Sequence, residues 1–267
     1  MILAVNIGNT NIAAGICRDG SIHQISLPTG SLSAGAELRG LLEDRLKALG
    51  ESPGAIEGSV LSSVVPHKTR LVGDAIRDFT GMPPWVVDEF SQTGLDITAY
   101  GSDLLGVDRV VCCVSALEKY PPPLVVFDLG TATTANVLDS AGAFLGGAIL
   151  PGVRMGLEAL AAGTSQLPQL KAYGHPPLIG RDTRQCLAAG AVYGAAFAIE
   201  GFTRRIEEEL GQKVTAVVTG GNAPQVIPCC KRAPYYEPTL LLEGLALLHQ
   251  RHGPTNGKGD QRAINQS

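Results

Sequence analysis

The chain has 267 residues and a mass of 27.8 kDa, enough for one large or two small domains that bury roughly three quarters of the unfolded surface. Hydrophobic residues make up 45% and charged residues 17%, so the composition is that of a folded globular protein and excludes a disordered chain. The net charge of −4 and the scarcity of aromatic residues (6 Phe, 6 Tyr, 1 Trp) argue against a nucleic-acid partner.

No segment predicts a membrane partner or a leader peptide. The start, MILAVNIGNT, has neither a basic region nor a cleavage site. The longest uncharged, mostly apolar stretch, Cys186–Ile199, is shorter than the about 20 residues that cross a bilayer. Six cysteines include two adjacent pairs but no C-x-x-C, which favours reduced thiols over a zinc site or disulfides. We therefore expect a cytoplasmic protein.

The first half of the chain reads as a three-stranded unit followed by helices and further strands. Apolar runs predict strands at 1–7, 12–17 and 21–27, and Asp19-Gly20 is typical of a hairpin turn. Leucines at helical spacing predict a helix over 34–49. Further along we expect a strand at 58–65 that Pro66 ends, a helix at 67–80, a strand at 85–87 and a helix at 108–120.

The same order then begins again. We expect strands at 124–129, 134–138 and 143–150, a helical region at 182–210, a strand at 214–219 and a helix at 239–250. The turns Gly8-Asn9-Thr10 and Gly130-Thr131-Ala132 follow the first strand of each half. This repeat predicts duplicated α/β domains that face each other across a cleft. We place the two lobes at 1–120 and 121–250, with a disordered tail at 251–267.

Turns of this composition expose backbone N–H groups and small hydroxyls, which can cradle phosphate oxygens. Two of them at equivalent places favour a nucleotide between the lobes. Asp128 lies beside the second turn, where a carboxylate either caps the turn or serves a metal ion, and the equivalent position in the first half is Asn6. Gly220-Gly221 is either a plain strand-to-helix turn or backbone close to an adenosine.

Several other polar residues have a structural and a functional interpretation. Asp108, in Gly106-Val107-Asp108-Arg109 before a helix, is either an N-cap or a general base, with Arg109 binding an anion. Thr183 follows Gly180 and is expected by default to be an N-cap, and Tyr100 a packed ring. The Ala/Gly stretch 188–198 favours tight helix packing or a dimer interface over a ligand site.

At these residues the sequence resembles the type III pantothenate kinases, a family of the actin-like ATPase (ribonuclease H-like) superfamily. The resemblance extends from residue 1 to about 250 and rests on the order and spacing of several motifs. They are NIGNTNIAAGI at 6–16, SSVVP at 62–66, Tyr100 with GVDR at 106–109, FDLGTATT at 127–134, GGAILPG at 146–152, LP at 167–168, IGRDT at 179–183 and TGG at 219–221.

The resemblance implies duplicated actin-like domains and ATP-dependent phosphorylation of pantothenate to 4′-phosphopantothenate, the first step of coenzyme A biosynthesis. Asp108 would accept the proton of the pantothenate hydroxyl, and Asp128 would hold K⁺ or NH₄⁺, beside the Mg²⁺ that accompanies ATP. The ATP site would comprise Asn6, Ile7, Gly8, Asn9, Thr10, Asn11, Ile12, Ala13 and Thr131. The pantothenate site would comprise Tyr100, Gly106, Val107, Asp108, Arg109 and Thr183, drawn from both subunits of a homodimer.

Two positions depart from the family pattern. Asn6 stands where the family has Asp, and Arg181-Asp182 stands where the family more often has Lys-Asn. Asn6 keeps a carbonyl acceptor but lacks the negative charge that would face the metal and the phosphates. Two alternatives follow: another actin-like small-molecule kinase, against which GVDR and Tyr100 argue, and a non-catalytic paralogue that binds nucleotide or pantothenate and acts through a protein partner.

Overall fold

The computed structural model describes residues 1–31, 34–88, 91–101, 105–170 and 174–253, which form two five-stranded sheets. The strand order is β3-β2-β1-β4-β5 in the first sheet and β10-β9-β6-β7-β8 in the second. In each sheet the first three strands pair antiparallel, and the last two add in parallel on the other side of the first strand. The two sheets therefore share one topology, which confirms the predicted duplication.

The predicted strands and helices occur in the predicted order, and the described chain also contains elements that were not predicted: a short strand, two helices and three 3₁₀ turns. The strands are β1 (Ile2–Ile7), β2 (Asn11–Arg18), β3 (Ser21–Pro28), β4 (Gly58–Ser63), β5 (Trp85–Val87), β6 (Leu124–Leu129), β7 (Ala132–Leu138), β8 (Phe144–Pro151), β9 (Thr215–Thr219) and β10 (Tyr235–Tyr236). The helices are α1 (Ala34–Ala48), α2 (Pro66–Thr80), α3 (Val107–Lys119), α4 (Val153–Gly163), α5 (Thr183–Leu210), α6 (Ala223–Val226) and α7 (Leu240–His252), with short 3₁₀ turns η1 (Pro53–Ala55), η2 (Thr98–Tyr100) and η3 (Ile227–Cys229).

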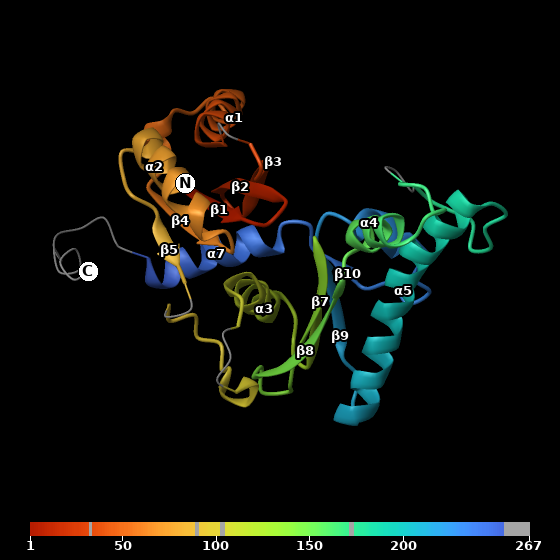
Figure 1. Ribbon diagram of the computed structural model, residues 1–267. Helices are drawn as coiled ribbons and strands as arrows, with labels where there is room; N and C mark the ends of the chain where they lie inside the picture. Colours follow the sequence, from red (N-terminus) through yellow and green to blue (C-terminus); the bar gives the residue numbers. More distant parts are fainter. Residues whose placement is uncertain (32–33, 89–90, 102–104, 171–173, 254–267) are drawn as a thin grey trace.

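Helices α3 and α7 lie between the two sheets, while α1 and α2 cover the outer face of the first sheet and α5 that of the second (Figure 1). Side-chain alternation along β1 explains the two faces. Val5 and Ile7 enter the outer core with α1 and α2, whereas Ala4 enters the core shared with α3 and α7. Asn6 therefore shares the inner face with Ala4.

The same alternation holds in β6 of the second sheet. Val126 packs into the central core with α3 and α7, and Phe127 packs into the outer core with α5. Asp128 therefore shares the inner face with Val126. On its inner face the first strand of each sheet thus carries one polar residue near its end, Asn6 in β1 and Asp128 in β6.

Helix α7, the last helix of the described chain, packs on the first sheet. It contacts β1, β2 and β4 as well as α3, although it follows the last strand of the second sheet. It extends to His252, two residues into the segment 251–267 that we expected to be a tail. The rest of that segment, 254–267, lies outside the described residues. The boundary between lobes at residue 120 stays a prediction.

The turn between β2 and β3 forms as its sequence predicts. Asp19 has a φ of 49° and Gly20 a φ of 77°, and Arg18 pairs with Ser21 across the turn. Two consecutive positive φ values are the mark of a type I′ turn, whose twist matches that of the flanking strands. Helix α4, by contrast, was not predicted, because its sequence VRMGLEALAAG follows a Pro-Gly pair that reads as a loop.

Helix α5 is long and apolar enough, by length and composition alone, to cross a membrane. A core helix of a folded domain passes the same test. Val192, Ala196 and Ile199 are buried along one side of α5, and Ala196 and Ile199 pack into the outer core of the second sheet. The last turns of α5 carry the charges of Arg204, Arg205 and Glu207–Glu209.

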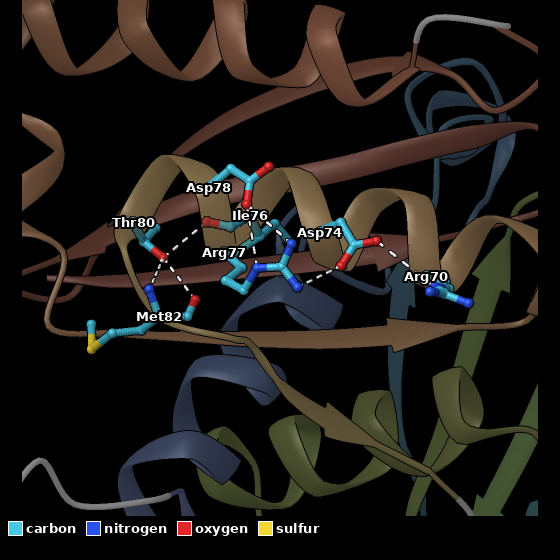
Figure 2. Close-up of polar contacts among 7 residues, drawn as sticks. All are labelled: Arg70, Asp74, Ile76, Arg77, Asp78, Thr80 and Met82. Atoms are coloured by element: carbon cyan, nitrogen blue, oxygen red, sulfur yellow. Dashed lines mark hydrogen bonds and ion pairs between the residues drawn. The ribbon is translucent and has the colours of Figure 1, made fainter.

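The outer surface of α2 carries an exposed ion-pair network. Asp74 lies 2.8 Å from Arg77 and 3.9 Å from Arg70, and Arg77 also contacts Asp78 (Figure 2). Exposed pairs of this kind typically contribute less than about 1 kcal/mol to stability. The network therefore provides a charged surface on the outer side of the first sheet, where loss of one ion pair should change stability little.

Candidate active site

The two Gly/Thr/Asn turns meet between the lobes. In the first turn the Gly8 N–H donates to the Asn11 carbonyl at 3.0 Å, and in the second the Gly130 N–H donates to the Ala132 carbonyl at 3.1 Å. The hydroxyls of Thr10 and Thr131 form a hydrogen bond of 2.7 Å across the two turns. The predicted repeat thus places equivalent turns face to face.

Asn6 and Asp128 occupy equivalent register positions below these turns. Asn6 pairs with Ala13 and Ser62 on its two sides, and Asp128 pairs with Thr134 and Thr219. The Ser62 hydroxyl donates to Asn6 Oδ1 at 2.8 Å. Each lobe therefore presents one amide or carboxylate beside a hydroxyl residue of the neighbouring parallel strand.

The carboxylate of Asp128 is half-buried and has no hydrogen-bond donor among the described residues. Burial, and after it the charge of Asp108, raises the pKa of Asp128 to about 7. A Cβ on Gly220 would lie 2.5 Å from Asp128 Oδ1, so glycine there keeps room beside the carboxylate. Because the charge of Asp108 acts on Asp128, the two carboxylates belong to one site.

Helix α3 begins beside Asp128 and carries Asp108 in its first turn. The N-cap is Gly106 and makes no side-chain hydrogen bond, so the N-cap interpretation of Asp108 is wrong. Asp108 is the second residue of the helix, and its Oδ1 accepts the Arg109 N–H at 2.9 Å. A Cβ on Gly106 would lie 2.8 Å from that same oxygen, so glycine leaves space for the carboxylate.

The guanidinium of Arg109 is fixed by three neighbours. Its Nε donates to Asn136 Oδ1 at 2.6 Å, and one terminal nitrogen donates to the Tyr100 hydroxyl at 3.3 Å. Its central carbon lies 5.7 Å from the centre of the Tyr100 ring and 5.5 Å from that of Phe144. No carboxylate pairs with Arg109 among the residues that the structure describes. The cation is thus held in place and available to an anion.

Asn136 and Phe144 were missed by the sequence analysis. Asn136 is fully buried, and its Nδ2 donates to the Val126 carbonyl at 3.3 Å and to Thr134 Oγ1 at 3.2 Å. A buried amide in an apolar strand must find such partners, so Asn136 in the run Ala132–Leu138 was a signal for a polar contact. Its partner, 27 residues earlier in the chain, could not be read from the sequence.

Thr183 lies apart from this group within one chain. The N-cap of α5 is Asp182, whose carboxylate accepts the Gln185 N–H at 2.9 Å, so the expectation that Thr183 is the N-cap is wrong. Thr183 is exposed and lines a cavity of about 550 Å³ between α4 and α5. Neither Tyr100 nor any residue of 106–109 lines that cavity.

The turn after β9 clamps the second Gly-Thr turn. The Asn222 side-chain amide donates to the carbonyls of Leu129 and Gly130, each at 3.0 Å. Gly220 has a φ of 96°, which glycine adopts without strain. In the described part of the chain, no group of three or more His, Cys, Asp or Glu side chains gathers as a metal cluster.

Comparison with known proteins identifies relatives over nearly the whole chain. A sequence profile of the family "Type III pantothenate kinase" matches residues 2–205. The type III pantothenate kinase of Moorella thermoacetica is 35% identical over 256 residues, covering 94% of this chain and all of the relative. That of Salinispora arenicola is 34% identical over 254 residues, with the same coverage of both chains.

Solved structures agree with the fold. The activator of the 2-hydroxyisocaproyl-CoA dehydratase from Clostridium difficile, solved with bound ADPNP, superposes with a TM-score of 0.53 at 14% identity. The match covers 91% of each chain. At this identity the likeness concerns the fold alone, and together with the two equivalent sheets it establishes the duplicated actin-like ATPase architecture.

Proposed function

The chain belongs to the type III pantothenate kinase family, and on that premise we propose that it is a phosphotransferase that phosphorylates pantothenate to 4′-phosphopantothenate with ATP, the first step of coenzyme A biosynthesis. The observation that supports this proposal is the convergence of Asp108, Asp128 and Arg109 beside two equivalent Gly/Thr turns. Full-length similarity to enzymes and the retention of these residues favour a kinase over the non-catalytic alternative.

Phosphoryl transfer needs positioning and charge neutralisation more than covalent help from the protein. The backbone N–H groups and hydroxyls of the first turn, residues 6–13, would hold the ATP phosphates together with Thr131 of the second turn. Mg²⁺ would accompany ATP and reduce the repulsion between phosphate oxygens. Closure of the lobes would exclude water and limit hydrolysis of ATP.

Asp108 would take the proton of the pantothenate hydroxyl as the phosphoryl group is transferred. Its place in the first turn of α3, directly before Arg109, supports this role, because it sets the carboxylate next to the residue that would bind the pantothenate carboxylate. Arg109 would bind the pantothenate carboxylate. The hydrogen bonds from Arg109 to Asn136 and Tyr100 support that role, because they fix the guanidinium before substrate arrives.

Asp128 fits a monovalent cation, K⁺ or NH₄⁺. Its carboxylate is half-buried, lacks a donor among the described residues and would be contacted at 2.5 Å by any side chain larger than that of Gly220. A carboxylate oxygen is a hard ligand suited to an alkali ion. A cation there would neutralise a charge that is otherwise costly to bury next to Asp108.

A homodimer would bring Thr183 of one subunit to the pantothenate site of the other. In one chain Thr183 lines the cavity between α4 and α5, whereas the Arg109 guanidinium donates to Asn136 and Tyr100. Small residues such as Gly190 and Gly194 of α5 line the same cavity, and their size allows close helix packing. In a dimer, Thr183 of one subunit would complete the site of the other, and we propose a cytoplasmic location for this assembly.

The test is direct. Purified protein is incubated with ATP, Mg²⁺, K⁺ and pantothenate, and phosphopantothenate is detected by mass. Reactions without pantothenate or without protein are the controls. We expect product that depends on both substrates; ATP binding without any phosphopantothenate would instead support the non-catalytic paralogue.

A further inference from the structure

Asn6 turns its amide nitrogen toward the first phosphate-binding turn. The residue is half-buried on the inner face of β1, the face shared with Ala4. A Cβ placed on Gly8 would lie 3.8 Å from Asn6 Nδ2. The nitrogen is therefore the end of this amide that faces the turn.

The oxygen of the same amide is held by Ser62. Ser62 is fully buried on β4, directly beside Asn6 in the parallel register. Its hydroxyl donates to Asn6 Oδ1 at 2.8 Å. Among the described residues the buried Ser62 hydroxyl has no other acceptor, so a flipped amide would leave its O–H unpaired. The bond therefore holds the amide with its oxygen toward Ser62 and its nitrogen on the other side.

An amide nitrogen and a carboxylate have opposite chemistry in a phosphate site. The N–H₂ group only donates, and phosphate oxygens only accept, whereas Mg²⁺ binds oxygen ligands and never an amide nitrogen. With the ATP phosphates between the lobes, the orientation that Ser62 imposes gives Asn6 a hydrogen bond to phosphate. A carboxylate at this position would repel the phosphates unless a metal ion lay between them.

We propose that Ser62 is a positioning residue that makes Asn6 a direct hydrogen-bond donor to the phosphate oxygens of the nucleotide, in place of a ligand for Mg²⁺. The proposal rests on the proposed function, in that ATP is taken as the ligand of the cleft. It follows that the first lobe binds the phosphates directly, and that nucleotide affinity depends little on the metal at this position.

The test compares two buried serines of one strand. Ser62→Ala removes the hydroxyl that holds Asn6. Ser59→Ala is the matched control, because Ser59 is 3% exposed on the same strand and its hydroxyl has no hydrogen-bond partner among the described residues. Ser62→Cys, nearly equal in size to serine but a weak donor, serves if Ser62→Ala does not fold. Calorimetric titration measures the affinity of each protein for ATP in EDTA and in excess Mg²⁺.

We expect Ser62→Ala to weaken metal-free ATP binding roughly fivefold to tenfold, the worth of about one hydrogen bond. Binding of Mg²⁺-ATP should fall less than twofold, since the released amide can turn its oxygen toward water on the metal. The ratio of the two affinities should therefore shift in Ser62→Ala and Ser62→Cys and stay unchanged in Ser59→Ala. A merely structural role of Ser62 would lower both affinities together and leave the ratio unchanged.

An unchanged ratio in folded Ser62→Ala or Ser62→Cys would overturn the inference. The product assay on the unmodified protein separates this failure from that of the proposed function. Phosphopantothenate formed with an unchanged ratio in the variants would refute the inference alone. A shifted ratio without any product would support the inference and refute the kinase assignment.

Discussion

Thr10 and Thr131 share a hydrogen bond of 2.7 Å between their hydroxyl oxygens, although 121 residues separate them in the sequence. Each threonine belongs to the turn that follows the first strand of its own sheet. The bond therefore holds the two Gly/Thr turns together. If the ATP phosphates bind between the turns, as proposed, they would form hydrogen bonds with these two hydroxyls in place of the bond between them.

Cross-linking this pair should block turnover. In the double variant Thr10→Cys/Thr131→Cys, two sulfurs in place of hydroxyls 2.7 Å apart are well placed for a disulfide. Oxidation should lower the rate at least tenfold, and a reducing agent should restore it. The single variants, treated in the same way, control for oxidation of the six native cysteines. A cross-linked protein that turns over normally would show that the turns need not separate.

Removal of the Asp108 carboxylate should act on the chemical step. We expect Asp108→Asn to lower kcat by roughly 10²–10⁴ and to leave ATP affinity nearly unchanged, because an amide cannot accept the substrate proton. Asp74→Asn, in the exposed network of α2 (Figure 2), is the matched control and should leave kcat unchanged. Steady-state kinetics of both variants check this, and an unaltered kcat in Asp108→Asn would remove its role as base.

Asn136 should influence pantothenate binding through Arg109. Asn136→Ala removes the acceptor that lies 2.6 Å from Arg109 Nε and leaves that donor without its partner. We expect the KM for pantothenate to rise roughly tenfold, which corresponds to about 1.4 kcal/mol, with the KM for ATP unchanged. Arg109→Lys should have a larger effect, because lysine cannot reproduce the guanidinium fork. Equal increases in both KM values would point to a general loss of structure.

Asp128 should couple cation binding to pH. Its pKa of about 7 in the fold exceeds the ordinary value of 3.8, so between these values the folded protein holds a proton that the unfolded chain releases. The stability contributed by this group is therefore highest at low pH and falls as pH rises toward 7. The proposed K⁺ would bind the ionised carboxylate, so K⁺ should raise the Tm more at pH 8 than at pH 5, relative to choline chloride at equal ionic strength.

The control for this coupling is Asp128→Asn, which lacks the titrating group and should show no difference between K⁺ and choline at either pH. Activity should also rise when K⁺ or NH₄⁺ replaces Na⁺ in the unmodified protein. A Tm that responds equally to K⁺ at pH 5 and pH 8 would contradict the assignment of the cation to Asp128.

Local patterns predicted the fold well where the controlling residues are neighbours in the chain. Asp19-Gly20 specified the hairpin turn, and apolar runs around Gly8 and Gly130 predicted the duplicated strands. The sequence could not predict contacts set by strand register. Asn136 meets Arg109 only because β7 pairs with β6 so that Asn136 lies opposite Val126, on the face that α3 covers. Residue-level roles at the site likewise depended on family resemblance.

The replacement of Asn6 by aspartate should change the affinities for Mg²⁺-ATP and for metal-free ATP in opposite directions. Aspartate can still accept the Ser62 hydrogen bond through one oxygen, so the fold should be retained. The second oxygen would place a negative charge at the turn, where a charged contact is worth roughly 1.5–3 kcal/mol, or about tenfold to a hundredfold in affinity. We therefore expect Asn6→Asp to bind Mg²⁺-ATP more tightly and turn over faster, and to bind metal-free ATP more weakly. Parallel titrations with Mg²⁺ and with EDTA measure both effects; superimposable curves for the two proteins would show that an amide and a carboxylate serve equally at this position.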